Sequence, residues 1–153
     1  MFIKEGDLFH GLPSHIIDEV AGFAMEESCP AGHLIFEAGD FAESLYVLEE
    51  GIVALNYGAK GKDPIIFAVD EPGNIFGWSA LVEPNRYTAT AKSVGNSKVI
   101  RLDGVQLEHV FERHPHEGFI VMRRLAGIIA SRIQAGYQHE FRHSSEPVKA
   151  MYV

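Results

Sequence analysis

The sequence contains one cysteine and one tryptophan, and it lacks both an excess of positive charge and any long apolar run. A single thiol, Cys29, excludes an intrachain disulfide and favours a reducing compartment. No apolar stretch approaches the roughly 18 residues that a membrane-spanning helix needs. Residues 1–7 have no basic region followed by an apolar core, so no signal peptide is expected. The predicted location is therefore the cytoplasm, away from the membrane.

Charge narrows the range of partners further. The sequence has 13 Lys and Arg residues and 21 Asp and Glu residues, which gives a formal net charge of −8. Proteins that bind nucleic acids gain much of their affinity by neutralising phosphates, so direct DNA binding is not expected. A small anionic ligand remains compatible with this charge, because a few backbone N–H groups and one Arg can hold a phosphate locally.

The length of 153 residues suits a single domain, and its 15 glycines and seven prolines favour short strands over a helical bundle. A first helix is expected from about Ser14 to Met25. Short apolar stretches then alternate with turn residues, and they predict strands near 33–36, 45–48, 52–57, 65–69, 87–91 and 98–102, with a hairpin loop at 58–62. A short helix should follow Gly104, and a longer one should run from about His116 to Tyr137.

These elements predict a mainly β domain, an antiparallel sandwich or jelly roll flanked by helices. The domain is expected to cover 1–138, with its barrel at about 27–103 and its C-terminal helices at 104–137. Residues 139–153 are weakly patterned and are expected to form a frayed tail.

The segment Pro72–Leu81, followed by Val82–Ala91, is the most informative stretch for function. A strand ends at Gly77, where a residue without a Cβ lets backbone approach a ligand closely. The helical turn expected at residues 79–82 would direct free N–H groups at negative charge. Arg86 could add a charge-assisted clamp, although a solvated loop Arg is an equally good interpretation.

At this point the sequence resembles the cyclic-nucleotide-binding domain, the sensor half of transcription factors of the catabolite-activator and nitrogen-fixation-regulator type. The resemblance covers roughly Phe9–Tyr137. It rests on the motifs Leu45–Gly51 and Pro72–Gly77 and on the glycines at 32, 39, 51, 73 and 77. It implies a double-stranded β-helix (jelly roll), a regulatory role without catalysis, and a cyclic nucleotide such as cAMP, or another small anion, as ligand.

The resemblance also suggests the ligand-binding residues: Gly77, Trp78, Ser79, Ala80, Leu81, Arg86, Tyr87 and Thr88. Trp78 stands where nucleotide-binding members have a Glu that binds the ribose 2′-hydroxyl, and an indole cannot accept that hydrogen bond. The family's phosphate-binding Arg falls at Tyr87 in ungapped register and at Arg86 after a slip of one residue. The alternative function is a binding-incompetent interaction module whose pocket Trp78 fills.

A cupin-like metalloenzyme is the rival β-barrel interpretation. The sequence His114–Glu117 contains the His-x-His pair and the acid of that family, but it falls between two helices after the barrel. No triad or paired-carboxylate motif is evident from spacing, so no metal and no catalytic residue are expected.

The long helix carries apolar residues over a wide arc. Leu125, Ile129 and Ile133 are expected to be exposed in a monomer, and pairing with a second copy would cover them, as in the family's dimeric regulators. The 16 residues after this helix are too few for the helix-turn-helix module that those transcription factors append. The predicted protein is therefore a stand-alone sensor that signals through its helix to a protein partner.

Overall fold

The structure is a computed structural model, and it describes residues 3–58 and 66–143. Eight strands and three helices follow one another along these residues, together with two short 3₁₀ turns. The elements are η1 (Ile3–Glu5), α1 (Ser14–Ala21), β1 (Met25–Cys29), β2 (Leu34–Phe36), β3 (Ser44–Glu50), β4 (Val53–Asn56), β5 (Ile66–Val69), β6 (Ile75–Phe76), η2 (Trp78–Ala80), β7 (Thr90–Ser93), β8 (Ser97–Asp103), α2 (Gly104–Arg113) and α3 (Pro115–His143).

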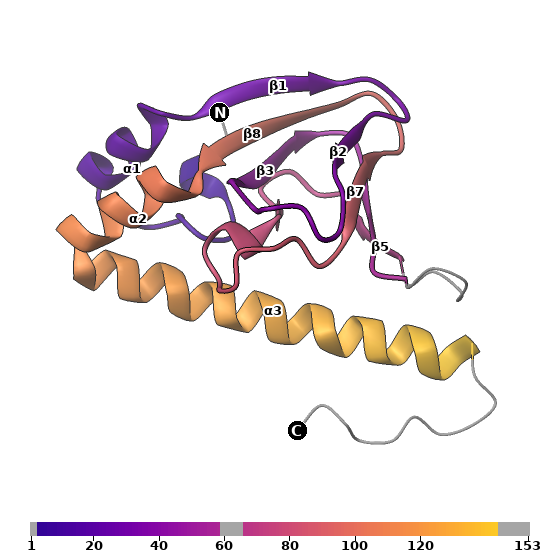
Figure 1. The fold of residues 1–153 in the computed structure, drawn as a ribbon. Coiled ribbons are helices and arrows are strands. Elements are labelled where there is room, and N and C mark those ends of the chain that lie inside the picture. Colours follow the sequence, from indigo (N-terminus) through magenta and orange to yellow (C-terminus); the bar gives the residue numbers. More distant parts are fainter. Residues whose placement is uncertain (1–2, 59–65, 144–153) are drawn as a thin grey trace.

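The strands form two four-stranded antiparallel sheets, in the orders β1-β8-β3-β6 and β2-β7-β4-β5. Together they make the barrel in Figure 1, where α1 and α2 lie at one end and α3 passes beneath. The predicted fold class, a mainly β jelly roll with flanking helices, is confirmed. Among the described residues, none of the helices is long and apolar enough to cross a membrane.

The β3 strand explains how the two halves of the core are connected. Residues 44–49 are all buried, because the strand has a packed layer on each face. Successive side chains alternate between faces. Leu45 and Val47 therefore belong to the outer cluster, the hydrophobic cluster that packs against the helices. Tyr46 and Leu48 belong to the cluster between the sheets. The outer cluster thereby fixes the helices to the same strand that forms one wall of the barrel.

Several predicted boundaries were wrong. Helix α1 ends at Ala21, and Met25, expected as its last residue, opens strand β1 opposite Arg101. The strand expected at 87–91 begins only at Thr90. Helix α3 continues to His143, six residues beyond the predicted end at 137. Most of the predicted hairpin loop at 58–62 and of the tail lies outside the described residues.

The expected exposure of Leu125 was also wrong, since it is 1% exposed. Leu125 lies one helical turn after Val121, so both side chains share the face of α3 that packs into the outer cluster. Ile129 is half-buried against the same cluster, and Ile133 is 47% exposed as expected. Among the α3 side chains that the structure describes, the large exposed apolar ones are Phe119, Met122 and Ile133.

Candidate functional site

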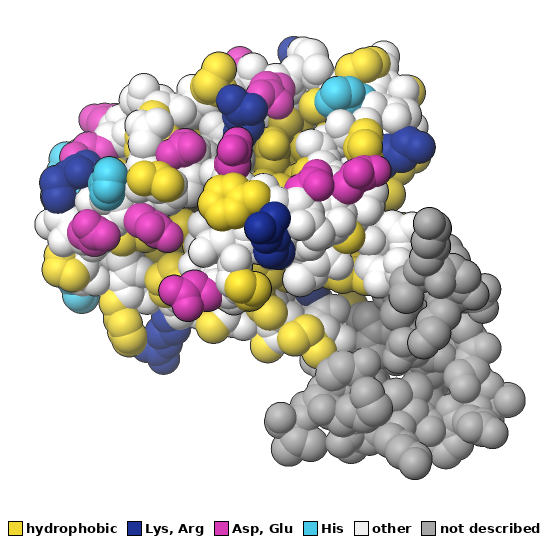
Figure 2. Space-filling model, viewed as in Figure 1, with side chains coloured by type: hydrophobic (Ala, Val, Ile, Leu, Met, Phe, Trp, Pro, Cys, Tyr) yellow, Lys and Arg dark blue, Asp and Glu magenta, His cyan; other side chains and the backbone are white. Residues whose placement is uncertain are grey.

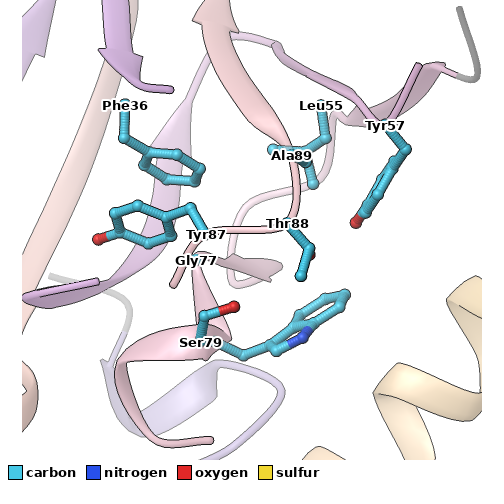
Figure 3. A pocket seen from close by; sticks show the side chains of 9 residues that line it. Phe36, Leu55, Tyr57, Gly77, Ser79, Tyr87, Thr88 and Ala89 are labelled. Atoms are coloured by element: carbon cyan, nitrogen blue, oxygen red, sulfur yellow. The ribbon is translucent and has the colours of Figure 1, made fainter. Parts of the chain in front are cut away.

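A small cavity lies between the two sheets, at the end of β6. Its lining comes from β2, β4, the turn after β6 and the segment before β7: Phe36, Leu55, Tyr57, Gly77, Trp78, Ser79, Tyr87, Thr88 and Ala89. Figure 3 shows the rings of Phe36 and Tyr87 face to face on one side of the cavity, with Leu55, Tyr57 and Thr88 on the other. The free volume is only about 10 Å³. This is about the room of one water molecule.

Gly77 begins the turn that forms one wall of the cavity. Its backbone has φ of 76°, in the left-handed region that glycine adopts without strain. A Cβ at this position would lie 3.2 Å from both the Ser44 carbonyl oxygen and Tyr46 Cδ2, so a side chain here would crowd both groups. Both constraints explain why a glycine stands where β6 passes into η2.

The amides of this turn fall into two groups. Those of Ala80, Leu81 and Val82 donate to the carbonyls of Gly77, Trp78 and Ser79, at 3.3, 2.8 and 3.4 Å. Those of Gly77, Trp78 and Ser79 have no hydrogen-bond partner among the residues that the structure describes. Free amides were expected at residues 79–82. The turn η2 begins one residue earlier, at Trp78, and only the Ser79 amide of the predicted range has no partner among the described residues.

Hydrogen bonds hold the loop after η2 at both of its ends. Asn85 Nδ2 donates to the carbonyls of Ser79 and Ala80, at 3.0 and 3.3 Å. The Tyr87 amide donates to the Asp40 carbonyl at 2.9 Å, and the Gly39 amide donates to the Tyr87 carbonyl at 2.8 Å. These bonds fix the position of residues 85–88, of which Tyr87 and Thr88 line the cavity.

Arg86 and Tyr87 point in different directions. The Tyr87 ring lies in the cavity wall and stacks on Phe36 with the ring centroids 3.7 Å apart. Arg86 is exposed, donates from Nη1 to the Gly39 carbonyl at 3.4 Å, and lies 5.8 Å from the Phe41 ring centroid. Arg86 is absent from the cavity lining, and to reach it the side chain would have to leave Gly39 and Phe41.

Five of the eight predicted ligand residues therefore line one cavity: Gly77, Trp78, Ser79, Tyr87 and Thr88. Ala80 is buried in the cluster between the sheets, and Leu81 packs against the outer cluster. The other lining residues, Phe36, Leu55, Tyr57 and Ala89, were not singled out from the sequence. Side chains alternate between faces along the strand predicted at 52–57, which puts Leu55 and Tyr57 on the same face, and this alternation is the only signal in the sequence for two of these four residues.

The cavity is largely aromatic and carries no free charge. Burial raises the pKa of the Tyr87 phenol and of the Tyr57 phenol, so both stay neutral at physiological pH. A cation, Arg132 of α3, lies outside the wall with its guanidinium carbon 4.9 Å from the Trp78 ring centroid. Arg132 was not singled out from the sequence either.

The histidines of the metalloenzyme alternative lie away from the barrel. His114 follows α2, and its Nε2 is 2.7 Å from Glu19 Oε2 of α1, a salt bridge when the imidazole is protonated. Within 3–58 and 66–143, no three His, Cys, Asp or Glu side chains are grouped as metal ligands would be.

Comparison with known proteins connects this geometry to a family. The sequence model described as "Cyclic nucleotide-binding domain" matches residues 26–114, more than half of the chain. The chain is 27% identical over 132 residues to the cyclic AMP receptor protein of Thermus thermophilus, which covers 86% of this chain. The alignment covers 59% of the receptor, so this chain spans well under two thirds of that relative.

Solved structures agree with the sequence match. A protein of Geobacter metallireducens that is named for cyclic nucleotide binding superposes with a TM-score of 0.74 at 28% identity, covering 85% of this chain and 94% of that one. The Thermus thermophilus catabolite activator protein gives a TM-score of 0.70 at 27% identity, covering 85% and 59%. From its sequence and its jelly-roll fold, this chain belongs to the cyclic nucleotide-binding domain family.

Proposed function

We propose that this chain is a regulatory domain that binds a small anionic ligand, with cyclic nucleotides as the first class to test, and that it acts by binding and not by catalysis. One observation carries the proposal. Two segments predicted to contact the ligand, 77–79 and 87–88, line the same cavity although they are separate in the sequence. The family match supports the class of ligand.

The turn after β6 offers the chemistry for an anion. Three consecutive amides, those of residues 77–79, have no partner among the described residues. Successive N–H groups around a left-handed glycine can form a concave site for a phosphate. The Ser79 side chain and Thr88 lie beside the same cavity and add hydroxyl groups that can donate or accept. The sequence predicted Arg86 as the counter-charge, but this side chain points away from the cavity in this state.

The cavity must open before it can accept a nucleotide. Ligand pockets usually enclose roughly 300–1,000 Å³, whereas this one holds about 10 Å³. Trp78 is half-buried and belongs to the short turn η2, so moving its indole out of the cavity wall would disrupt little packing. The state described here is therefore the closed state of the proposed sensor.

The small volume also favours the second candidate function, a binding-incompetent interaction module. In that case Trp78 fills the space permanently, and the barrel serves only as a scaffold. The family's ribose-binding Glu is replaced by this Trp, which removes one acceptor that a nucleotide would use.

Signal transfer is proposed to run through α3. This helix exposes Phe119, Met122 and Ile133, which are 66%, 38% and 47% accessible. In Figure 2, hydrophobic side chains follow the lower edge of the molecule, where α3 lies in Figure 1. We propose a homodimer through this helix, a protein partner downstream, no direct contact with DNA, and the cytoplasm as the location. A ligand would then act by favouring one of two helix arrangements.

Isothermal titration with cAMP and cGMP tests the two candidates together. The sensor predicts saturable heat with the wild-type chain. The scaffold predicts none with the wild type, and heat with Trp78→Ala or Trp78→Glu if the indole alone closes the site. Absence of binding in all three proteins at millimolar nucleotide would reject cyclic nucleotides as ligands of this domain.

A further inference from the structure

Arg132 lies on α3, at the junction between the closed cavity and an open groove. Its guanidinium carbon is 4.9 Å from the ring centroid of Trp78, which lines the cavity, and 4.9 Å from that of Phe67, which lines the groove. Nη2 donates a hydrogen bond to the Ile75 carbonyl of β6. One side chain of the long helix thus contacts both the strand and the tryptophan that form the candidate site.

The other end of the guanidinium is unsatisfied. Nη1 is buried and has no hydrogen-bond partner among the described residues. Nor does any described carboxylate form a salt bridge with Arg132. Asp7 acts on it electrostatically, but Asp7 Oδ2 accepts a hydrogen bond from Asn74 Nδ2 at 3.2 Å.

A half-buried cation with one fully buried and unpartnered donor atom is costly. Burial lowers the pKa of Arg132, yet a guanidinium keeps its proton under all physiological conditions. An unused donor on a buried charge loses its hydration without compensation, and an anion placed against it restores the missing interaction. The arrangement is that of a counter-charge that has no partner yet.

The groove provides the route by which an anion reaches this charge. It has a volume of about 520 Å³ and lies between α3 and the N-terminal segment. Its lining includes Arg132, Phe67, Asn74 and Ser131, together with the two acidic residues Glu5 and Asp7. The second arginine of the groove, Arg124, already donates to the carbonyls of Leu8 and His10, at 3.0 and 2.7 Å. Arg132 is therefore the groove arginine with a buried donor that has no partner among the described residues.

We propose that Arg132, and not Arg86, supplies the positive charge that binds the anionic group of the ligand. The anion enters through the groove and takes the free Nη1. Trp78 leaves its stack on the guanidinium, and the cavity and groove merge into one site. Because Arg132 is part of α3 and directly precedes Ile133 of its exposed apolar face, occupancy of the site acts on the helix without an intermediate element. This assignment rests on the proposed ligand-binding function, but it can fail independently.

Inorganic phosphate is the first probe, and the indole is the reporter. Trp78 is the only tryptophan of the chain, so its emission reports on this site alone. The full-length wild type, Arg132→Gln and Arg86→Gln are titrated with phosphate at constant ionic strength, and Tm is followed in parallel. We expect a saturable change of emission and a rise in Tm for the wild type and Arg86→Gln, with affinity at least about tenfold lower in Arg132→Gln.

Three outcomes overturn the assignment: Arg132→Gln responds like the wild type, Arg86→Gln loses the response, or the wild type shows none. Circular dichroism establishes that the variants fold. If Arg132→Gln does not fold, Arg132→Lys replaces it, because Lys keeps the charge but loses the planar fork of donors. Unchanged phosphate affinity in Arg132→Lys would then count against the assignment.

Titration of the same proteins with cAMP and cGMP separates this inference from the proposed function. If nucleotide binding is unaffected by Arg132→Gln, the proposed sensor function is supported and the assignment of Arg132 to its ligand site is rejected. If the phosphate response depends on Arg132 but no nucleotide binds, the anion site is supported and cyclic nucleotides are rejected as its ligand.

Discussion

Tyr87 and Ser44 are joined by two hydrogen bonds through one hydroxyl group. The phenol donates to the Ser44 carbonyl at 2.7 Å and accepts from the Ser44 amide at 3.2 Å, and both bonds are buried. Ser44 is the first residue of β3, so these bonds tie the loop before β7 to the other sheet. Tyr87→Phe should remove both bonds and lower the free energy of unfolding by about 1–3 kcal/mol, as measured by urea denaturation.

Tyr46→Phe is the matched control for this substitution. Tyr46 is equally buried, and its ring stacks on Phe76 with centroids 5.1 Å apart. Its hydroxyl, however, forms no hydrogen bond with any of the described residues. This variant should therefore keep nearly all of the wild-type stability. Equal losses in the two variants would show that ring packing, and not the Ser44 bonds, accounts for the effect.

Gly77→Ala should damage both stability and the candidate site. Alanine at φ of 76° costs about 1–2 kcal/mol, and its Cβ would be 3.2 Å from the Ser44 carbonyl oxygen. Any relief of this contact moves the turn that carries the three free amides, so ligand response should fall together with Tm. Both are measurable on one sample, by thermal melts and by Trp78 emission.

Gly95→Ala provides the comparison for Gly77→Ala. A Cβ at residue 95 would have no heavy atom within 4 Å, and its backbone is not left-handed. Little change in Tm is expected, with a slight gain from the reduced freedom of the unfolded chain. If Gly77→Ala behaved like this control, the turn after β6 would not need a glycine, and the described geometry of the site would be wrong.

The order of the strands and helices could be predicted because it depends on residues that are close together in the sequence. Turn glycines and apolar stretches mark where strands stop and start, and Gly77 marked the site for the same reason. The helix boundaries were less accurate, since the apolar spacing near Met25 fits either a helix or the edge of a sheet. Only the pairing of β1 with β8 decides between them.

The wall of the cavity could be predicted only in part. Arg86 and Tyr87 are neighbours in an extended segment, so only one of them can face the barrel, and a slip of one residue reverses the choice. The bond from the Gly39 amide to the Tyr87 carbonyl and the bond from the Tyr87 amide to the Asp40 carbonyl fix the register that turns Tyr87 inward. The place of Arg132 depends on where α3 crosses the barrel, which helical periodicity does not encode.

Acid should weaken the contact between α1 and the C-terminal end of α2. The hydrogen bond from Arg113 to Glu19 lowers the pKa of that carboxyl below its ordinary value of 4.5, against the opposing effect of burial, and His114 lowers it further. A depressed pKa contributes stability above the unfolded value, and this contribution is lost as pH falls through the folded value. The Tm of the wild type should therefore exceed that of Glu19→Gln near neutrality, and the difference should shrink below about pH 4.5.

Glu108→Gln tests whether this effect is specific. Glu108 is exposed on α2 and forms no salt bridge with any of the described side chains. Its substitution should leave a Tm difference that is close to zero from pH 3 to pH 7, a range set by ordinary carboxyl titration. A difference between the wild type and Glu19→Gln that stays constant through the same range would contradict the ion-pair explanation.

Dimerisation through α3 is expected to depend on its exposed apolar face. Phe119, Met122 and Ile133 have separations of three and eleven residues, which place them on one stripe of a helix with a seven-residue repeat. Phe119→Glu and Ile133→Glu put like charges into that seam and should convert the dimer to a monomer in size-exclusion chromatography with light scattering. Val105→Glu changes an equally exposed apolar residue on α2, 58% accessible, and should leave the dimer intact. If the wild-type chain stays monomeric at high micromolar concentration, the proposed homodimer is rejected. If only Val105→Glu loses the dimer, the dimer interface includes α2 and not the apolar face of α3.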